Sequence, residues 1–366
     1  MAGAFPPPIH GMAAVNAAVR DILENANVHP VAIDVAAHSL DRSITARLGR
    51  VPRVVRGLLN LATQPGLRKA TIYMSVSGGF GQVYEIAFIL LIRLRAMRVI
   101  LHHHSFAYLD RFSRLTRIMV RIAGKNAVHI ALSPGMANQL SAVYYARNVI
   151  PISNTVFLSH TKRKPRFRKN LLSVGFIGNI TAEKGIFEFL DLMEQISNNN
   201  LPLVGKLAGP FQDQKIEDIV RSRIGGLPSI QYVGPKYNTD KEEFYDSIDV
   251  LIFPTRYVNE AEPMTLHEAM SNAIPVISYG RGCIPEIVTP DCGLVIEPNQ
   301  PFVSSAMHRL EQWLADPAEF QAASKAANER FENTHAENQG RWLTLLSTFI
   351  CQNETLPTLP ISVRGR

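Results

Sequence analysis

A pair of carboxylates follows a short apolar segment in the second half of the chain. The segment is Asp249–Thr255, and Glu260 and Glu268 come after it, separated by seven residues. Carboxylates accept hydrogen bonds from hydroxyl groups, so this pair suits the recognition of hydroxyl-rich sugar rings. An acidic cluster that stabilises a helix N-terminus would explain Glu262 between them, but not the pair itself.

A helix is expected to begin within this stretch. Pro263 marks its start, so that Glu260 lies in the turn before the helix and Glu268 on its first turns. The first N–H groups of a helix point at any anion placed there. The candidates are the N–H groups of Met264, Thr265 and Leu266. A diphosphate between two hydroxyl-rich rings would satisfy the carboxylates and the helix N-terminus together.

A lysine follows the first strand expected in this half. Residues Phe176–Leu190 read as strand, glycine turn and helix, with Gly178 and Asn179 in the turn. Lys184 stands at the helix start, where the helix dipole already favours an anion. A lysine is a poor choice there unless a phosphate is present, so we interpret Lys184 as a phosphate-binding residue.

The first half carries three histidines at the end of a strand, His102, His103 and His104. His102 and His104 share a face of the strand, because side chains alternate along it. A metal pair is conceivable, but no nearby Cys, Asp or Glu completes a ligand set. We expect at least one of these histidines to be functional.

Two glycine loops lie near the same edge. Gly78 and Gly79 fall in SGGFGQ, which is not a dinucleotide-binding GxGxxG, and would let a ligand or an opposite domain approach the backbone. Gly11 opens a helix after PPPIH, where it could present N–H groups to an anion or simply form a turn. The strand that should precede Gly11 is very short, so we hypothesise that the native start lies upstream of Met1.

These residues must be positioned by alternating strands and helices. Strands are expected at Val28–Val35, Ala70–Ser77, Arg98–His104 and Val128–Ser133, and within 171–178, 201–209, 229–234, 249–254 and 273–278. Near-continuous apolar strands with helical crossovers indicate parallel sheets covered on both faces. We therefore predict an α/β protein with two doubly wound domains. The expected divisions are 1–160, a basic linker 161–170, a second domain 171–340, and residues 341–366, where a C-terminal helix packs back toward the N-terminal domain and a tail follows.

The net charge of +7 conceals a strong asymmetry. Residues 1–170 hold 23 Lys and Arg against 6 Asp and Glu, a charge of +17, whereas the remainder carries −10. The first half should attract an anionic partner. Arg111–Lys125 has the pattern of a basic amphipathic helix that could lie on an anionic membrane, or of a solvated face on a core-packed helix. The linker is either simply charged or also in contact with lipid or acceptor phosphate.

Other partners and compartments are less favoured. Aromatic residues do not alternate with Lys and Arg, as single-stranded nucleic acid binding would require, so no nucleic acid partner is expected. Three scattered cysteines indicate a reducing compartment, and neither a signal peptide nor a membrane-spanning segment is apparent. We expect a cytoplasmic protein that is peripheral at the inner face of the membrane.

The chain resembles the GT-B-fold family 4 glycosyltransferases. Glu260 and Glu268 within NEAEPMTLHEAMSNAIPVIS are similar to that family's EX7E signature, and FIGNITAEKG to its donor-phosphate turn. GCIPEIV and CGLVIEP resemble the segments that follow, and PPPIHG, HHHSF and ALSPGM fit the amino-terminal domain. The resemblance covers nearly the whole chain and implies two Rossmann-like domains facing across a cleft.

The resemblance also implies a reaction and a set of roles. The reaction is a retaining transfer from a nucleotide-diphospho-sugar, GDP-mannose or a UDP-sugar, that requires neither a metal nor another cofactor. Glu260 would hold the donor sugar, Glu268 the ribose and Lys184 the leaving diphosphate. His104 would be the active-site histidine with His102 as second choice, and Ser133 matches a polar position at the end of the next strand. The family has an arginine where this chain has Asn179, so Lys206 or Arg256 would have to compensate.

The leading expectation is therefore a hexosyltransferase acting on a membrane-linked glycan acceptor in polysaccharide biosynthesis. A nucleotide-sugar epimerase or a phosphorylase on the same fold is an alternative, which predicts turnover without an acceptor or with inorganic phosphate. A non-catalytic module that binds a nucleotide-sugar or a nucleic acid is another.

Overall fold

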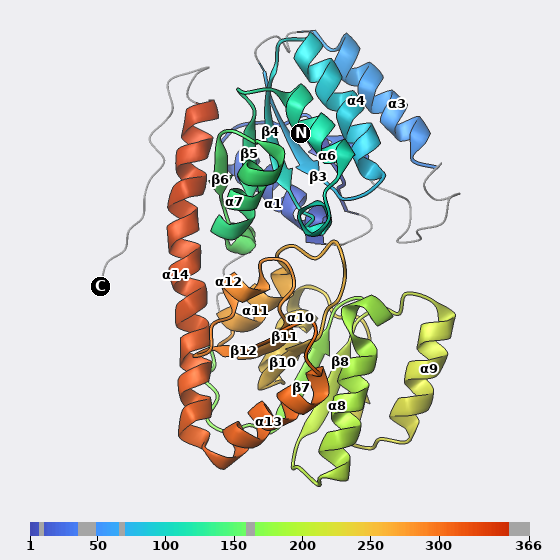
Figure 1. Cartoon of the computed structure of the whole chain (residues 1–366), viewed down its shortest axis with the longest axis vertical. Coiled ribbons are helices and arrows are strands. Elements are labelled where there is room, and N and C mark those ends of the chain that lie inside the picture. Colours follow the sequence, from blue (N-terminus) through green and yellow to red (C-terminus); the bar gives the residue numbers. More distant parts are fainter. Residues whose placement is uncertain (7–10, 36–48, 66–69, 159–164, 351–366) are drawn as a thin grey trace.

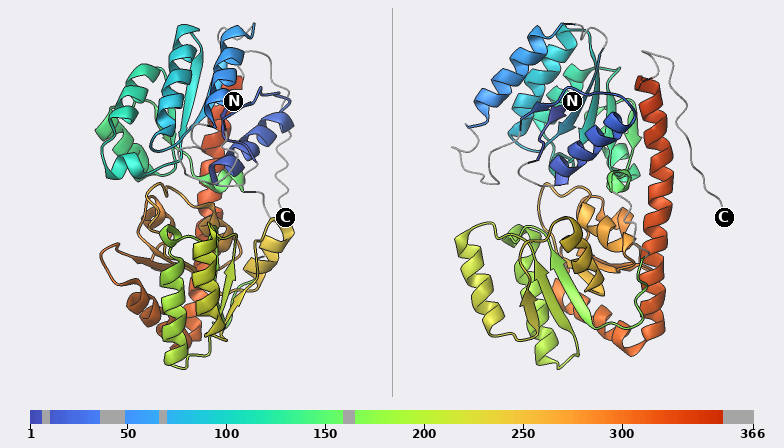
Figure 2. Two further views of the ribbon diagram at one scale, coloured as in Figure 1. Left: turned by 90° about the vertical axis from the view of Figure 1, so that its right-hand side faces the viewer. Right: turned by 180° about the vertical axis from the view of Figure 1, so that it is seen from behind.

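The computed structural model describes residues 1–6, 11–35, 49–65, 70–158 and 165–350. Two lobes are stacked along the long axis of the molecule, and one helix runs beside both (Figure 1). Each lobe holds a six-stranded parallel sheet with helices on both faces (Figure 2). The prediction of two doubly wound α/β domains is confirmed.

The N-terminal sheet has the strand order β2-β1-β3-β4-β5-β6. Its strands are β1 Ala2–Gly3, β2 Ile33–Asp34, β3 Thr71–Val76, β4 Arg98–His103, β5 Val128–Ala131 and β6 Val149–Pro151. Its helices are α1 Gly11–Asn25, α3 Val51–Thr63, α4 Gly81–Leu94, α5 Ala107–Asp110, α6 Arg114–Ala123 and α7 Pro134–Tyr144, with a 3₁₀ turn η1 at Asn154–Phe157. The order of strands reverses between β1 and β3, where parallel α/β sheets bind ligands.

One N-terminal strand is much shorter than expected. We predicted a strand over Val28–Val35, but β2 contains only Ile33 and Asp34. Asn27 adopts a left-handed conformation with φ of 57° after α1, and Pro30 has no N–H for a sheet hydrogen bond. Pairing with β1 therefore begins only at Ile33.

The C-terminal sheet has the order β12-β11-β10-β7-β8-β9. Its strands are β7 Ser173–Ile177, β8 Val204–Ala208, β9 Ile230–Tyr232, β10 Val250–Phe253, β11 Val276–Tyr279 and β12 Gly293–Ile296. Its helical elements are η2 Ala182–Lys184, α8 Ile186–Asn198, α9 Gln214–Gly225, α10 Asn238–Asp246, α11 Met264–Ser271, α12 Ile284–Ile287 and α13 Phe302–Ala315. Here the order reverses between β7 and β10, so the loops after these two strands meet at the ligand-binding edge.

The last described helix, α14 Pro317–Ile350, ties the lobes together. We expected a C-terminal helix from residue 341 that packs back toward the N-terminal domain, and the structure has one continuous helix that begins at Pro317 in the C-terminal lobe. Phe320 lies in the core of the C-terminal domain, whereas Trp342 and Leu345 pack in a cluster of the N-terminal domain with Phe157. The predicted tail, residues 351–366, lies outside the described residues.

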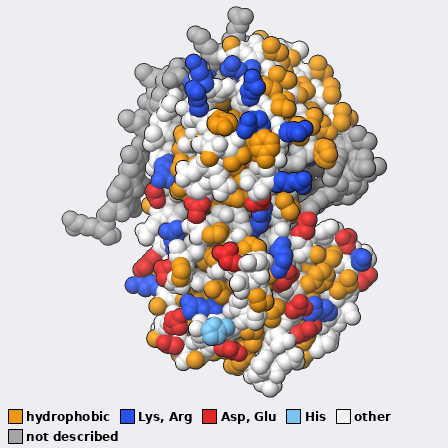
Figure 3. All heavy atoms as spheres, in the orientation of Figure 1, with side chains coloured by type: hydrophobic (Ala, Val, Ile, Leu, Met, Phe, Trp, Pro, Cys, Tyr) orange, Lys and Arg blue, Asp and Glu red, His pale blue; other side chains and the backbone are white. Residues whose placement is uncertain are grey.

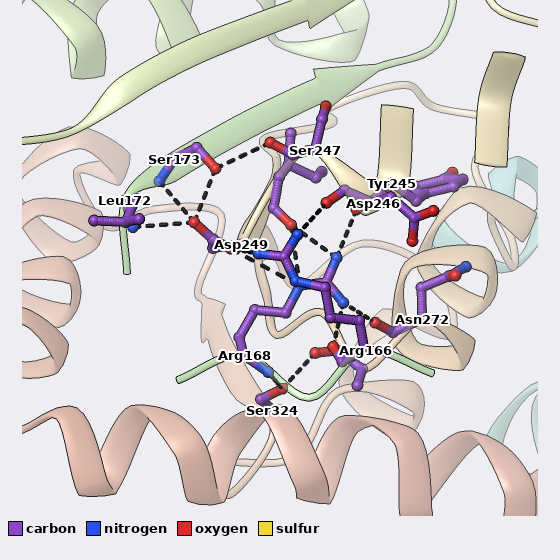
Figure 4. A network of polar contacts seen from close by, with 12 residues as sticks. Arg166, Arg168, Leu172, Ser173, Tyr245, Asp246, Ser247, Asp249, Asn272 and Ser324 are labelled. Atoms are coloured by element: carbon purple, nitrogen blue, oxygen red, sulfur yellow. Dashed lines mark hydrogen bonds and ion pairs between the residues drawn. The ribbon is translucent and has the colours of Figure 1, made fainter. Parts of the chain in front are cut away.

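The end of the predicted linker is built into the C-terminal domain. Arg168 is buried, and its guanidinium donates to the carbonyls of Tyr245 at 2.7 Å and Ile248 at 3.0 Å and to that of Asn272 (Figure 4). Burial lowers the pKa of Arg168 to about 10, and the nearby Asp249 opposes that shift. This arginine serves the fold and is not available to lipid or acceptor phosphate, and residues 159–164 lie outside the described part of the chain.

Candidate functional site

Lys184 and Glu260 meet at the point where the strand order reverses. Lys184 ends η2 after β7, Glu260 lies in the loop after β10, and the lysine ammonium forms an ion pair with the Glu260 carboxylate. The hydroxyl of Thr255 donates to the same carboxylate oxygen at 3.2 Å. The two residues are 76 apart in sequence, and both side chains are largely buried.

A glycine makes this approach of two loops possible. Gly185 follows Lys184 with φ of 87°, and a Cβ there would lie 2.2 Å from the carbonyl oxygen of Pro254. Only glycine fits such a contact in that conformation. Thr181 caps the turn by accepting the N–H of Lys184 at 3.0 Å. Local sequence thus fixes the lysine against the Glu260 loop.

Glu268 belongs to a different hydrogen-bonded group. It stands on α11, where its carboxylate accepts from Lys241 at 2.6 Å and from the Tyr245 hydroxyl at 2.7 Å. Burial raises the pKa of Tyr245 well above its ordinary value, and the neighbouring Glu268 raises it further. Tyr245 therefore remains a donor that fixes the carboxylate. Neither Lys241 nor Tyr245, both on α10, was singled out from the sequence.

The N-terminus of α11 offers two of the three expected donors. Its N-cap is Pro263, which has no side chain that could accept the first N–H groups. Met264 and Thr265 are half-buried. The N–H of Leu266, by contrast, donates to the carbonyl of Pro263 at 3.2 Å, and the residue is fully buried. Leu266 is therefore corrected from a ligand contact to a core residue.

The turn after β7 also lies at this edge. Gly178 has φ of 150°, its N–H donates to Ala208 at 3.2 Å, and a Cβ at Gly209 would lie 1.8 Å from its carbonyl oxygen. Asn179 next to it is half-buried. The turn is held close to the end of β8.

The three histidines of the N-terminal domain are placed differently from one another. The rings of His102 and His104 lie 4.0 Å apart on one face of β4, as alternation predicts. His102 is fully buried, and its ring shares a hydrogen bond of 2.5 Å with the Tyr73 hydroxyl. Burial lowers the pKa of His102 well below its ordinary value, and the neighbouring His104 lowers it further. His104 is only half-buried. His102 therefore supports His104 from behind and does not line the cleft as predicted.

His103 points to the opposite face. It bonds to the Tyr108 hydroxyl at 2.8 Å and to His129 at 3.0 Å. Burial lowers the pKa of His103 well below its ordinary value and that of His129 to about 4. Both imidazoles are therefore neutral near pH 7.

A contact between domains brings the His104 loop against the Glu260 loop. Ser105, the residue after His104, donates to the side chain of Asn259, the residue before Glu260, at 2.9 Å. A Cβ at Gly78 would lie 2.2 Å from the same Asn259 oxygen, so the opposite domain does approach this glycine. Gly79 is exposed with φ of 69°, and Gly11 is exposed with no atom of the described residues within 4 Å of its Cβ position.

Ser133 takes part in a second contact between domains. Its hydroxyl accepts the N–H of Met136, which caps α7, and donates to Glu286 at 2.5 Å. Glu286 also accepts the N–H of Gly135 at 2.9 Å. Glu286 was not singled out from the sequence, although it lies within GCIPEIV.

Glu262 makes the third contact between domains, a role that the sequence did not predict. It is 7% exposed, and its carboxylate accepts the Ser153 hydroxyl at 2.6 Å and the Asn154 N–H at 2.5 Å. His267, on its own domain, bonds to it at 2.9 Å. Glu262 therefore joins the domains, and stabilising the helix start is not its main role.

A pocket of about 240 Å³ opens beside the Glu260 loop. It is lined by Asp110, Thr255, Arg256, Val258, Tyr279, Arg281 and Pro298. Arg281 forms an ion pair with Asp110 across the domains. The guanidinium of Arg256 pairs with Glu188 at 3.2 Å and lies over the ring of Tyr279. The backbone N–H of Arg256 donates to the backbone carbonyl of Glu183, the residue before Lys184. Lys206 lies within β8, whereas the backbone of Arg256 is bonded directly to the turn that holds Lys184.

Two Rossmann-like domains with their ligand edges turned toward each other define the GT-B fold. Structures that share it include Anabaena HepE in complex with UDP and glucose, with a TM-score of 0.68 and 14% identity over 95% of this chain and 98% of that one. Sucrose-phosphate synthase from Thermosynechococcus elongatus matches with a TM-score of 0.67 and 18% identity over 88% of this chain and 84% of that one.

The sequence also matches known proteins. The family described as glycosyl transferases group 1 matches residues 159–330, a range that contains all the strands of the C-terminal sheet. A sulfoquinovosyl transferase of Arabidopsis thaliana is 24% identical over 63% of this chain and 47% of its own length. An amylovoran biosynthesis glycosyltransferase of Erwinia amylovora is 24% identical over 61% of this chain and 63% of its own. The chain spans about half the length of the curated relatives it matches.

Proposed function

We propose that the protein is a retaining glycosyltransferase of the family 4 type. It moves a hexosyl group from a nucleotide-diphospho-sugar to a glycan or lipid-linked acceptor in polysaccharide or glycolipid biosynthesis. One observation carries the proposal: the Ser105–Asn259 contact sets the His104 loop against the loop in which Glu260 meets Lys184. The match to glycosyl transferases group 1 and the glycosyltransferase relatives support the same reaction class.

The Lys184–Glu260 ion pair suggests how the donor enters. A diphosphate competes with the carboxylate for the lysine ammonium, and its phosphate oxygens offer it more negative charge. Once Lys184 turns to the diphosphate, Glu260 is free to accept hydrogen bonds from the hydroxyl groups of the donor sugar. In the transition state, Lys184 neutralises charge as it develops on the leaving diphosphate.

Other groups complete the donor site. Glu268, fixed by Lys241 and Tyr245, accepts from the ribose hydroxyls. The N–H groups of Met264 and Thr265 face the diphosphate, as uncapped helix N-termini favour anions. Arg256 supplies the second cation that Asn179 does not.

His104 contributes from the other domain. It is half-buried, whereas His102 is fully buried, and we assign to its ring a hydrogen bond to a hydroxyl of the donor sugar. Acceptor contacts come from Gly11 at the start of α1 and from Gly78 and Gly79 in the loop after β3. The acceptor is linked to a membrane, and the protein works at the cytoplasmic face of an anionic bilayer.

Donor binding and transfer test this proposal in sequence. Thermal unfolding is measured with GDP-mannose, UDP-glucose and UDP-N-acetylglucosamine, because a ligand that binds only the folded form raises the melting temperature. The donor that does so is then incubated with glycan acceptors and with inorganic phosphate. Transfer that requires an acceptor and is abolished by Glu260→Gln, in a protein with unchanged melting temperature, supports the proposal. Turnover without acceptor would indicate an epimerase, and phosphate-dependent turnover a phosphorylase.

A further inference from the structure

The basic helix that the sequence identifies does not offer its apolar side to a membrane. On α6, Met119, Val120 and Ala123 are buried in the core of the N-terminal domain. Thr116 is buried as well and bonds to Gln82 of α4 at 2.8 Å. The apolar face expected to enter a bilayer is thus already used for folding, and α6 presents chiefly arginines to the outside.

The neighbouring helix α4 has an outer face that no other described element covers. Val83, Leu90 and Leu94 are 49%, 45% and 83% exposed. Their spacing of seven and four residues puts them on one side of the helix. A globular domain normally buries such an apolar stripe in its core. Its exposure on α4, which packs between α3 and α6, indicates a surface that binds a partner.

Flanking helices extend this surface. α3 packs beside α4, where Gly57 lets the ring of Phe88 approach to 3.0 Å from its Cβ position, and exposes Val55 and Leu59. α6 lies on the other side of α4 and exposes Ile118. The three helices stand side by side at the outside of the N-terminal lobe (Figure 2). We name this surface the α3–α4–α6 face.

The charge on this face has one sign. Arg56 on α3 and Arg114 and Arg121 on α6 are exposed. α3 and α6 contain no acidic residue, and the one acid on α4, Glu85, is turned inward and accepts from the N–H and hydroxyl of Ser77 at 2.8 and 2.6 Å. In Figure 3, blue and orange side chains gather on the upper lobe, and red ones appear at the level of the cleft and below.

We propose that the α3–α4–α6 face docks on an anionic lipid bilayer. Leu90 and Leu94 enter the boundary between headgroups and acyl chains, and the arginines of α3 and α6 bind the headgroups on either side. Apolar burial and attraction to anionic lipid together give reversible peripheral binding. A second copy of the chain fits less well, because two such faces would bring like charges together without an acid to pair them.

This inference rests on the proposed function only for its purpose, which is to hold the cleft near a lipid-linked acceptor. The binding itself can be measured without any sugar. The full chain is sedimented with vesicles of phosphatidylcholine alone and with vesicles containing an equal amount of phosphatidylglycerol. Binding should require phosphatidylglycerol and should weaken as salt rises, because salt screens exposed charges.

Matched variants distinguish binding through this face from nonspecific adsorption to vesicles. Leu90→Gln combined with Leu94→Gln should weaken partition at least about tenfold, given the apolar area removed from the bilayer. Arg56→Gln combined with Arg121→Gln should weaken it by roughly tenfold or more, from the cost per basic residue near an anionic surface. Leu172→Gln combined with Ile219→Gln removes two exposed apolar side chains of the C-terminal domain and should change nothing.

Two results would overturn the proposal. One is equal vesicle binding by the Leu90/Leu94 variant and the wild type, at equal melting temperatures. The other is a chain that ignores vesicles and forms dimers that this variant abolishes, as judged by light scattering. Vesicle binding without any stabilisation by nucleotide-sugars would leave docking intact and would count against the proposed transfer reaction, so the two failures are distinguishable.

Discussion

Replacing Glu262 is expected to loosen the two domains from each other. Its carboxylate is 7% exposed and accepts from Ser153, Asn154 and His267. Hydrogen bonds to a charged group contribute about 1.5–3 kcal/mol each, and they do not add fully. A buried donor left without its acceptor costs about 1–3 kcal/mol, and Glu262→Ala leaves three such donors. We therefore expect Glu262→Ala to lower the free energy of unfolding by about 4 kcal/mol.

Glu262→Gln should be milder. The amide oxygen can still accept the N–H of Asn154, and the Ser153 hydroxyl can rotate to accept from the new amide N–H. The loss should then be about 1–2 kcal/mol, mainly the charge-assisted part of the bonds. Glu297→Ala, at an exposed position, is the matched control and should lie within about 0.5 kcal/mol of wild type.

Urea unfolding followed by tryptophan fluorescence measures both the loss and its location. Trp313 is buried in the C-terminal domain, and Trp342 packs against Phe157 at 5.1 Å where α14 meets the N-terminal domain. If Glu262 couples the domains, Glu262→Ala should separate the transitions that the two tryptophans report. A single transition within about 1 kcal/mol of wild type would refute the reasoning. In the folded variant, donor binding should survive and transfer should fall, because only transfer needs both domains aligned.

Three further predictions concern single side chains. Lys184→Gln should lower kcat by about 10²–10³-fold without unfolding the protein, because it removes transition-state charge stabilisation; unchanged kcat would count against its role. Since the folded state lowers the pKa of His129 from 6.5 to about 4, the unfolded chain binds protons first as pH falls through that window. Stability should therefore drop by up to about 3 kcal/mol between these values. In urea unfolding across this pH range, His129→Gln should reduce the drop, while His103 keeps its own contribution. Burial, opposed by bonds from Ser77, raises the pKa of Glu85 from 4.5 to about 7, so stability should fall as pH rises through that range, and Glu85→Gln should remove that slope.

The fold was readable from the sequence because the signals are local. Apolar strands such as Thr71–Val76 and Val250–Phe253 and the helices between them are set by patterning within one element, and the parallel two-domain arrangement follows from their alternation. The start of β2 and the continuous α14 were missed. Both depend on backbone conformation at single positions and on packing against distant residues.

The site was predicted in part for the same reason. Lys184 and Glu260 each follow a strand, so their meeting at one sheet edge was foreseeable. Lys241 and Tyr245, which hold Glu268, have no local pattern that marks them, and they become visible only when α10 packs beside α11. His102 fails as a cleft residue because alternation fixes which face it shares and says nothing of how deeply that face is buried.

The three glutamates of one short stretch show where sequence reasoning reaches its limit. Glu260, Glu262 and Glu268 are chemically identical and lie within nine positions. Glu260 pairs with a lysine that a phosphate can recruit, Glu268 is fixed by a lysine and a tyrosine, and Glu262 accepts bonds from the opposite domain. Their different roles therefore come from the partners that the fold supplies. Glu262 accepts hydrogen bonds from neutral groups of the other domain and from His267 of its own domain. The other half of the sequence therefore holds no basic residue that would identify Glu262 as a contact between domains. Lys184, by contrast, is recognisable because it precedes a glycine in a turn. Residues that align domains through neutral donors should escape sequence analysis in other two-domain folds for the same physical reason.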